Sequence, residues 1–307
     1  MSCAWITHAD CRRHEMGEGH PECPGRLDAI SDFLVSTRLM HYLAPCEAPL
    51  ATREQLEQAH TAGYVAEIHA AAPREGYLHL DPDTAMNPHS LQAALRAAGA
   101  AVMGAEMVVS GEFRRAFCAV RPPGHHAMRE RAMGFCIFNN VAVGIRHALN
   151  VLGLERVALV DFDVHHGNGS EDILANDDRV LMASTFQRGL YPFFGEEPLG
   201  ANMVNVGLAQ GADGEALREA VERSWLPALE RFRPQLLFIS AGFDAHRADD
   251  MAGLRFVESD YEWVTRELVG VAERHCGGRI VSCLEGGYHL FALARSVAAH
   301  VRELAGA

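Results

Sequence analysis

Short segments that are apolar at nearly every position alternate with helix-like segments along most of this chain. The predicted strands are residues 4–7, 116–120, 157–160, 180–185, 203–206, 236–241 and 279–284. Strands without polar alternation are buried on both faces, as in parallel sheets covered by helices. The predicted helices are residues 27–34, 53–69, 90–109, 140–152, 213–232, 259–276 and 290–304. The pattern predicts an α/β fold, and a single domain over residues 1–307 because no linker or repeat interrupts it.

The composition limits the partners and the compartment. The formal net charge of −13 argues against nonspecific nucleic-acid binding and against an anionic membrane surface. The first residues lack the apolar core of a signal peptide, and no run approaches the roughly 18 apolar residues of a membrane span. The eight cysteines form no CxxC pair, which indicates reduced thiols. We therefore expect a cytoplasmic protein that binds neither nucleic acid nor membrane.

The segment VALVDFDVHHGNG, residues 157–169, places ionisable side chains directly after a buried strand. Acidic residues in such a position are costly to bury unless they are paired or bind a metal. Side chains alternate along an extended chain, so we expect Asp161, Asp163 and His165 to point to one side. A carboxylate and an imidazole placed in this way can hold one divalent cation together.

Polar residues follow four of the predicted strands. AFCAV runs into RPPGHH, VALV into DFDVHHGN, LLFISA into GFDAH, and IVSCLE into GGYH. In open parallel sheets, sites form at the carboxyl ends of the strands. We therefore expect one site that combines His125, His126, Asp161, Asp163, His165, Asp244 and Tyr288.

Asp163, His165 and Asp244 are the candidate metal ligands. Three protein ligands with an open position are typical of a catalytic metal, whereas a structural zinc has four. Two oxygens and one nitrogen suit one Zn²⁺ per chain, and Fe²⁺, Co²⁺ and Mn²⁺ are alternatives. Such a metal lowers the pKa of its water to about 7 and polarises a carbonyl group.

The tandem histidines and Tyr288 are the candidate groups for proton transfer. Imidazole is the suitable base near neutral pH for activating water. Asp161 can orient one imidazole of the pair His125–His126, and Asn168 can orient the other. Two glycines before Tyr288 allow the backbone to approach closely, so its phenol can donate to an oxyanion.

The segments HPECPGRL, RPPGHHA, GFCIFNNVA, DFDVHHGNG, AGFDAH and LEGGYHL occur in this order over residues 20–289. Together they resemble the zinc-dependent histone deacetylase family, including its bacterial, class II-like amidohydrolases. The resemblance implies an arginase/deacetylase-like three-layer fold with a central eight-stranded parallel sheet. It implies hydrolysis of acetyl or related acyl groups from lysine side chains or similar amines. In this resemblance His126 is the general base, His125 its electrostatic or acid partner, and Tyr288 the donor to the tetrahedral intermediate.

The resemblance also implies supporting sites. It places a monovalent cation, K⁺, at Asp161, Asp163, His165, Ser184 and Thr185. The residues that it places around the substrate are Asp83 at the rim, Phe135 and Tyr191 as tunnel walls, and Gly134, Met251 and Gly286. Arg26 is expected below the metal.

Several alternatives remain open from the sequence. Asn168 stands where many eukaryotic members carry Asp, and Met251 falls near a position where polyamine-selective members carry Glu. The absence of that Glu argues against acetylpolyamines. The expected substrate is an acylated lysine peptide or protein, and the alternative is a small acylated amine such as an acetylpolyamine. An arginase-type ureohydrolase with two Mn²⁺ ions and a non-catalytic acyl-lysine binder are the other readings. The polar loop 8–26 is the candidate segment for a homo-oligomer contact or for narrowing of the tunnel.

Overall fold

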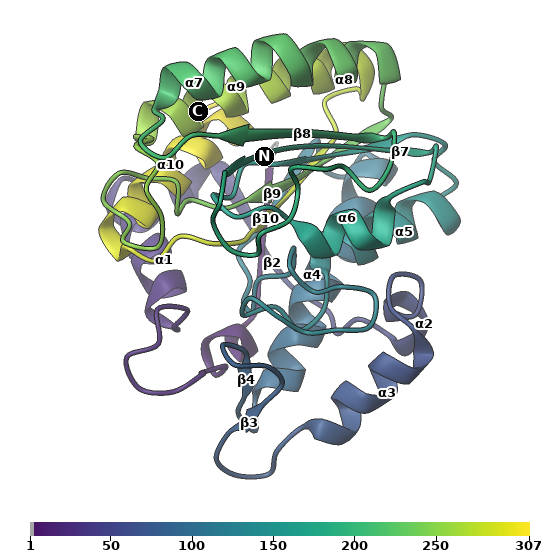
Figure 1. The fold of residues 1–307 in the computed structure, drawn as a ribbon, viewed down its shortest axis with the longest axis vertical. Coiled ribbons are helices and arrows are strands. Elements are labelled where there is room, and N and C mark those ends of the chain that lie inside the picture. The colour runs from purple at the N-terminus through teal and green to yellow at the C-terminus, as the bar shows by residue number, and fades with distance from the viewer. Residues whose placement is uncertain (1–2) are drawn as a thin grey trace.

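A parallel sheet of eight strands forms the centre of the molecule in the computed structural model, which describes residues 3–307 (Figure 1). All neighbouring strands of this sheet run parallel. In spatial order the strands are β2 (Leu43–Glu47), β1 (Cys3–Thr7), β5 (Arg115–Cys118), β10 (Ile280–Leu284), β9 (Leu236–Ala241), β6 (Val157–Asp161), β7 (Val180–Gln187) and β8 (Met203–Leu208). The predicted α/β fold with an eight-stranded parallel sheet is confirmed.

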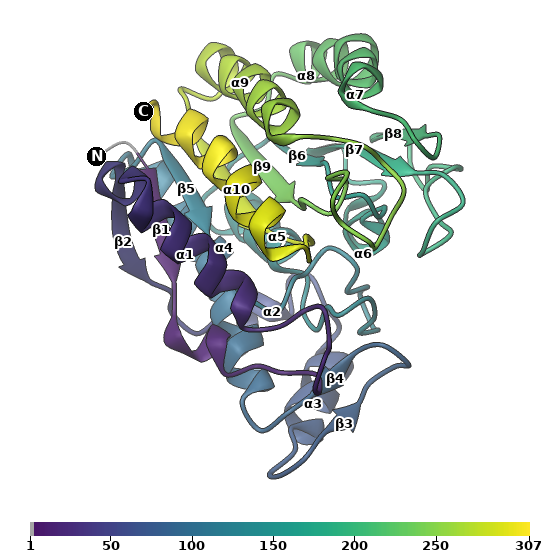
Figure 2. The ribbon, with the colours of Figure 1, turned by 90° about the vertical axis from the view of Figure 1, so that its left-hand side faces the viewer.

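Helices cover both faces of this sheet, which gives three layers. One face carries α4 (Ser90–Ser110), α5 (Asn140–Asn150) and α6 (Asn168–Leu174). The other carries α1 (Gly25–Ser36), α7 (Gly214–Ala220), α8 (Leu226–Phe232), α9 (Glu258–His275) and α10 (Leu290–Ala305). Figure 2 shows α1, α10 and α9 side by side on that second face. The strands are consequently buried on both sides, as their continuous apolar sequences require.

The structure corrects two sequence predictions in the first half of the chain. The predicted helix 53–69 is two helices, α2 (Arg53–Leu56) and α3 (Ala62–Ala71). They separate because the Thr61 side chain accepts the N–H of Tyr64 and so begins a new helix. The strand β2 was not predicted, because it is a half-exposed edge strand that contains Pro45.

Smaller elements complete the chain. A hairpin of β3 (Leu78–His79) and β4 (Ala85–Met86) projects beside α3 (Figure 2). A π-helical turn, Val221–Trp225, joins α7 to α8 inside the predicted helix 213–232. The helix α4 is long and apolar enough to cross a membrane by length and composition alone. However, 67% of its apolar window lies buried in the protein, as in a core helix.

The sheet order determines where the site can form. β5, β10, β9 and β6 are neighbours in the middle of the sheet, and they are the four strands that lead into the polar segments. Because parallel strands end at the same edge, the loops after these four strands lie together. All eight cysteines are free, and six of them are buried, as expected for reduced core thiols.

Candidate active site

Asp163, His165 and Asp244 lie together beyond the ends of β6 and β9. One ligand atom from each falls within 4.8 Å of the others, and all three residues are buried. His165 Nδ1 is 3.1 Å from Asp163 Oδ1 and 3.3 Å from Asp244 Oδ2. The structure therefore brings the three predicted ligands to one point.

A turn, and not strand alternation, positions the first two of these ligands. β6 ends at Asp161, so the expected alternation does not extend to Asp163 and His165. Instead, Asp161 Oδ1 accepts the N–H of Asp163 at 3.1 Å, and Asp163 Oδ1 accepts the N–H of His165 at 2.9 Å. Each carboxylate thus fixes the backbone two residues further on.

The donor atoms of this cluster fit a divalent cation. Asp244 Oδ2 is buried and accepts no well-aligned hydrogen bond from residues 3–307, although His165 Nδ1 lies 3.3 Å away; Asp244 Oδ1 accepts the N–H of Val164 at 3.0 Å. Burial, and then the charge of Asp163, raise the pKa of Asp244 to about 6. Two buried carboxylates this close together are costly unless a cation compensates their charge. Asp163 Oδ2, in contrast to Asp244 Oδ2, accepts a backbone hydrogen bond, from the N–H of Gly286 at 2.8 Å.

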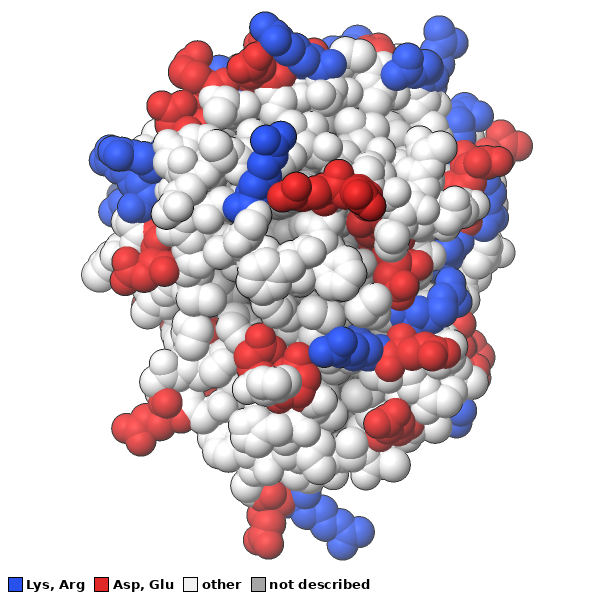
Figure 3. Space-filling model, viewed as in Figure 1, with Lys and Arg blue, Asp and Glu red and all other residues white. Residues whose placement is uncertain are grey.

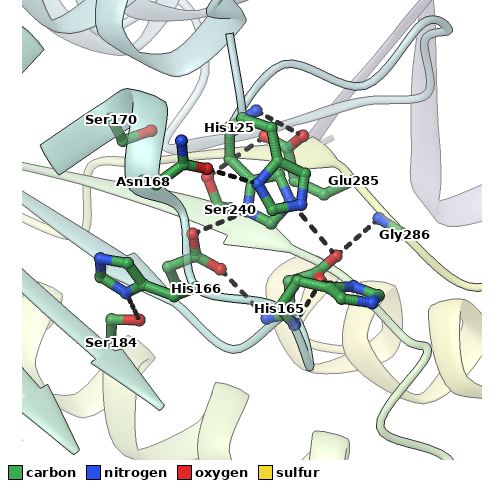
Figure 4. Close-up of polar contacts among 12 residues, drawn as sticks. His125, His165, His166, Asn168, Ser170, Ser184, Ser240, Glu285 and Gly286 are labelled. Carbon is green, nitrogen blue, oxygen red and sulfur yellow. Dashed lines mark hydrogen bonds and ion pairs between the residues drawn. The ribbon is translucent and has the colours of Figure 1, made fainter. Parts of the chain in front are cut away.

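The tandem histidines lie beside the cluster, and each has its own partner. His125 Nδ1 is 3.0 Å from Asp161 Oδ2, and His126 Nδ1 is 2.8 Å from Asn168 Oδ1. Figure 4 shows Asn168, Glu285 and Gly286 grouped around His125 and His165. The amide oxygen of Asn168 only accepts, so Nδ1 of His126 is the protonated nitrogen and Nε2 keeps its lone pair.

These two imidazoles differ in charge. Burial alone would lower the pKa of His125, but the carboxylates of Asp163 and Asp161 raise it to about 10. Burial, and then the charges of His125 and His165, hold the pKa of His126 well below its usual range. His125 is therefore a cation paired with carboxylates, and His126 is a neutral base.

Glu285 supports the histidine turn, and the sequence analysis did not identify it. Its Oε2 accepts the N–H groups of Gly124 at 2.6 Å and His125 at 3.1 Å, and the Ser240 hydroxyl donates to its Oε1 at 3.2 Å. Burial raises the pKa of Glu285 to about 7. The signal was present in the sequence, because Glu285 directly continues an apolar strand as Asp161 does.

A cavity of about 250 Å³ leads to this group from the surface. Its lining residues are Asp83, His126, Gly134, Phe135, His165, Leu190, Tyr191, Met251 and Tyr288. The rings of Phe135 and Tyr288 meet edge to face at 5.8 Å, and those of His126 and Tyr191 at 5.3 Å. Five of the predicted substrate residues line this cavity; Gly286 lies behind it against Asp163, and Leu190 was not predicted.

The turn at Gly134 and Phe135 forms one wall of the cavity and has an unusual backbone. Both residues have positive φ, 57° and 67°. The carboxylate of Asp83 accepts the N–H of Gly134 at 3.2 Å, and the hydroxyl of Thr84 accepts the N–H of Phe135 at 3.0 Å. A Cβ at Gly134 would lie 2.5 Å from the His126 ring, so only glycine fits there. Asp83 is thus bound to the wall as well as placed at the rim.

Tyr288 lies in the cavity opposite this wall. The guanidinium of Arg26 stacks over its ring at 4.9 Å, and Arg26 Nε donates to the carbonyl of Gly287 at 2.7 Å. Desolvation raises the pKa of the phenol well above its ordinary value. The hydroxyl is consequently protonated and can donate. Arg26 itself is held by Glu22, a buried carboxylate that the sequence analysis missed.

The predicted monovalent site shares Asp163 and His165 with the triad, and two of its other members, Ser184 and Thr185, lie on β7 beside β6. Asp161 and Ser184 are register partners in β6 and β7. Ser184 Oγ is 3.3 Å from His166 Nδ1, and Thr185 Oγ1 is buried without a hydrogen-bond partner among residues 3–307. The polar loop 8–26 reaches the cavity, because His20 contacts the ring of Phe135 at 4.7 Å.

With this geometry established, the comparisons with known proteins define the class. The histone deacetylase domain profile matches residues 20–304. A histone deacetylase-like amidohydrolase from Pseudomonas aeruginosa is 39% identical over 88% of this chain and 73% of its own length. An uncharacterised protein from Synechocystis, slr0245, is 37% identical over 98% of this chain and 99% of its own. The crystal structure of the HDA15 HD domain superposes with a TM-score of 0.93 at 32% identity, over 99% of this chain and 88% of that one.

The chain belongs to the histone deacetylase family. It is a deacetylase-type hydrolase, and the cluster of Asp163, His165 and Asp244 is its candidate metal site.

Proposed function

We propose that this protein hydrolyses acetyl or related acyl groups from the side-chain amine of lysine, using one Zn²⁺ held by Asp163, His165 and Asp244. One observation carries this proposal. A single narrow cavity is lined at once by a metal-ligand candidate, His165, a neutral imidazole, His126, and a protonated phenol, Tyr288. These three groups are what amide hydrolysis by water requires: activation, a base, and a donor to the oxyanion.

The bound metal would polarise the substrate carbonyl and acidify the attacking water. His126 Nε2 accepts the proton of that water, because Asn168 fixes the proton of the ring on Nδ1. The Tyr288 hydroxyl donates to the developing oxyanion. His125 stays protonated beside Asp161 and stabilises negative charge in the site. The proton then passes from imidazole to the leaving amine.

The cavity walls support an acyl-lysine side chain as substrate. The aliphatic part of the lysine side chain would contact four apolar or aromatic residues of the wall: Phe135, Tyr191, Leu190 and Met251. Met251 has no carboxylate that could bind the second amine of an acetylpolyamine, which disfavours acetylpolyamines as substrates. Within residues 3–307, only one group of His, Cys, Asp and Glu side chains lies close enough for a metal, which disfavours a two-metal ureohydrolase.

We also propose K⁺ at Asp161, Asp163, His165, Ser184 and Thr185. The unpartnered Thr185 hydroxyl and the adjacent Ser184 hydroxyl are oxygen donors suited to a hard cation. The net charge of −13 supports a protein without nucleic-acid or membrane partners. Buried free cysteines support a reducing, cytoplasmic compartment.

Tyr288→Phe tests the proposal. Loss of one oxyanion donor typically lowers the rate by about 10²–10³-fold. We expect that loss in kcat for an acetyl-lysine peptide, with one metal ion per chain retained by elemental analysis. Tyr42→Phe is the matched control, because Tyr42 is exposed and precedes β2, at the opposite end of the parallel strands from the cavity. A fully active Tyr288→Phe enzyme would contradict the role, and a wild-type protein that binds acetyl-lysine without turnover would be a reader and not a hydrolase.

A further inference from the structure

A second depression adjoins the active-site cavity. The segment between β7 and β8 forms a groove of about 560 Å³ that is lined by Gly189, Leu190, Phe193, Phe194, Gly195, Glu196, Glu197 and Leu199. Three of its apolar side chains are open to solvent: Phe193 is 77% exposed, Phe194 51% and Leu199 54%. Scattered exposed apolar residues are ordinary, but three gathered in one groove are typical of a binding surface.

The groove is held in shape from behind. The carbonyl of Gly195 accepts a hydrogen bond from Asn205 Nδ2 at 3.0 Å, and the N–H of Leu199 donates to Glu171 Oε1 at 3.0 Å. Glu171 also binds Asn205 Nδ2 at 2.9 Å and His166 Nε2 at 2.6 Å. Since His166 follows the metal-ligand candidate His165, these hydrogen bonds connect the groove to the turn that carries the candidate metal ligands. It is therefore a formed surface before anything binds.

The groove is continuous with the acyl-lysine cavity. Leu190 lines both, and the next residue, Tyr191, lines the cavity. Phe193 and Phe194 follow two and three residues after Tyr191, so a peptide that left the cavity mouth on this side would meet them. Because an extended chain advances about 3.3 Å per residue, the groove is within reach of residues a few positions from the acylated lysine.

The charge of the groove defines its occupant further. Glu196 and Glu197 are both exposed, and neither has an ion-pair partner in the described part of the chain. The neighbouring basic residue, Arg188, packs its side chain over Gly207 of β8. Figure 3 shows acidic and basic side chains side by side around uncharged surface in the middle of this face, and Glu196 and Glu197 are the acidic residues that line the groove. Apolar contacts with an acidic border complement a segment that is both apolar and basic.

We propose that this groove binds the peptide that flanks the acylated lysine, and that it selects flanks with an apolar side chain next to Lys or Arg. The inference rests on the proposed deacylase function and narrows its substrate to peptides and proteins. A small acylated amine fills the cavity alone and gains nothing from the groove.

Matched substrates and variants test this inference. The substrates are an acetyl-lysine peptide with apolar and basic flanks, the same peptide with Gly and Ser flanks, and acetyl-lysine methylamide. The variants are Phe194→Ala/Leu199→Ala, which removes apolar surface, and Glu196→Gln/Glu197→Gln, which removes the charge. Tyr42→Ala and Glu222→Gln, both exposed elsewhere, are the controls.

We expect wild-type kcat/KM to favour the apolar, basic peptide by about 10-fold or more, chiefly through KM, which corresponds to one or two good contacts. The apolar double variant should lose this preference and retain full activity on the methylamide. The charge variant should lose the salt dependence of kcat/KM for the basic peptide. Fluorescence anisotropy of the labelled peptide measures the same preference without turnover.

Three results would overturn the inference: equal kcat/KM for both peptides, an equal loss on peptide and methylamide in the variants, or a homodimer that dissociates in the apolar variant. The last would make the groove a contact between copies of this chain. Failure of the proposed function gives a different result, because then none of the substrates is hydrolysed. In that case, the difference in affinity between the two peptides, measured by fluorescence anisotropy, decides whether the groove binds peptide.

Discussion

The carboxylate of Asp249 accepts the backbone N–H of Tyr288 at 2.6 Å. The same oxygen accepts the N–H of His289 at 2.9 Å, and the other oxygen accepts the N–H of Met251 at 3.1 Å. Asp249 is only 6% exposed. One buried carboxylate therefore fixes the backbone of the proposed oxyanion donor and of a cavity wall residue together. Asp249 could not be singled out from the sequence, because nothing in it distinguishes Asp249 from the adjacent Asp250.

Asp249→Ala should lower kcat through misplacement of the Tyr288 hydroxyl. A shift of about 1 Å can cost up to about 10²-fold in rate, so we expect a loss of about 10–100-fold. The measurement is a double-mutant cycle with Tyr288→Phe. Once the hydroxyl is absent its position no longer matters, so Asp249→Ala should have little further effect on kcat. Equal losses in both backgrounds would assign Asp249 a general structural role, and exposed Asp250→Ala is the control.

Gly286→Ala should remove the metal. A Cβ at this position would lie 2.0 Å from Asp244 Oδ2 and 2.6 Å from Asp163 Oδ2, so the two carboxylates would have to move apart. We expect less than one ion per chain by elemental analysis, and a melting temperature that no longer rises when Zn²⁺ is added. Gly63→Ala is the matched control, because nothing lies within 4 Å of its added Cβ. Full metal content in Gly286→Ala would show that the triad is not the binding site.

Asn168→Asp should move the acid limb of the pH–activity profile to higher pH. A carboxylate beside His126 Nδ1 stabilises the imidazolium more than the present amide does, so the pKa of His126 rises. The base is then protonated, and inactive, up to a higher pH. We expect a shift of about one unit or more in the acid limb of kcat/KM. An unmoved limb in Asn168→Asp would assign the limb to another group, and exposed Asn150→Asp is the control.

Protonation of the buried His60 side chain should lower the free energy of unfolding in acid. Its Nδ1 donates to the carbonyl of Met128 at 3.0 Å and its Nε2 accepts the N–H of Asn139 at 3.0 Å, which requires the neutral ring. Burial lowers the pKa of His60 from 6.5 to about 4. The unfolded state therefore binds more protons between these values, and stability is lost as the pH falls from 6.5 to 4. The free energy of unfolding should therefore fall by about 3 kcal/mol, since each unit of pKa difference between the folded and unfolded states corresponds to about 1.36 kcal/mol.

The measurement for His60 is the free energy of unfolding in urea at pH 7 and at pH 4. His60→Asn is less stable at pH 7 because the ring is lost, but it lacks this titration. The gap between wild type and His60→Asn should therefore narrow toward pH 4. Exposed His41→Asn serves as the control. A gap that stays constant over this range would mean that His60 does not cause the acid loss.

The alternation of apolar strands with helices was sufficient to predict the sheet, because a strand buried on both faces has a distinctive sequence. β2 has no such signature, since an edge strand carries polar residues and a proline. The break between α2 and α3 depends on one cap, Thr61, inside a sequence of good helix formers. Local patterns thus identified the central strands, but not the edge strand β2 or the break between α2 and α3.

The site was predictable where its residues continue strands. Asp161, His125 and Tyr288 follow apolar runs, and the structure places each of them at one edge of the sheet. Glu285 gave the same signal and was overlooked. Asp249 and Leu190 act through contacts with distant segments, and such contacts are set by packing that no local spacing encodes.

The position of β10 has a consequence for the order in which the chain can fold. β10 is the last strand in sequence, yet it lies between β5 and β9 in the interior of the sheet. During synthesis, two parts of the sheet, β2-β1-β5 and β9-β6-β7-β8, cannot be joined until residues 280–284 are available. Until then, β5 and β9 each have an unpaired edge. Pairing over such separations is slow, and unpaired edges invite wrong partners. Tyr288 follows this strand by four residues, so a newly made molecule completes its sheet and acquires the proposed oxyanion donor at the same stage of synthesis.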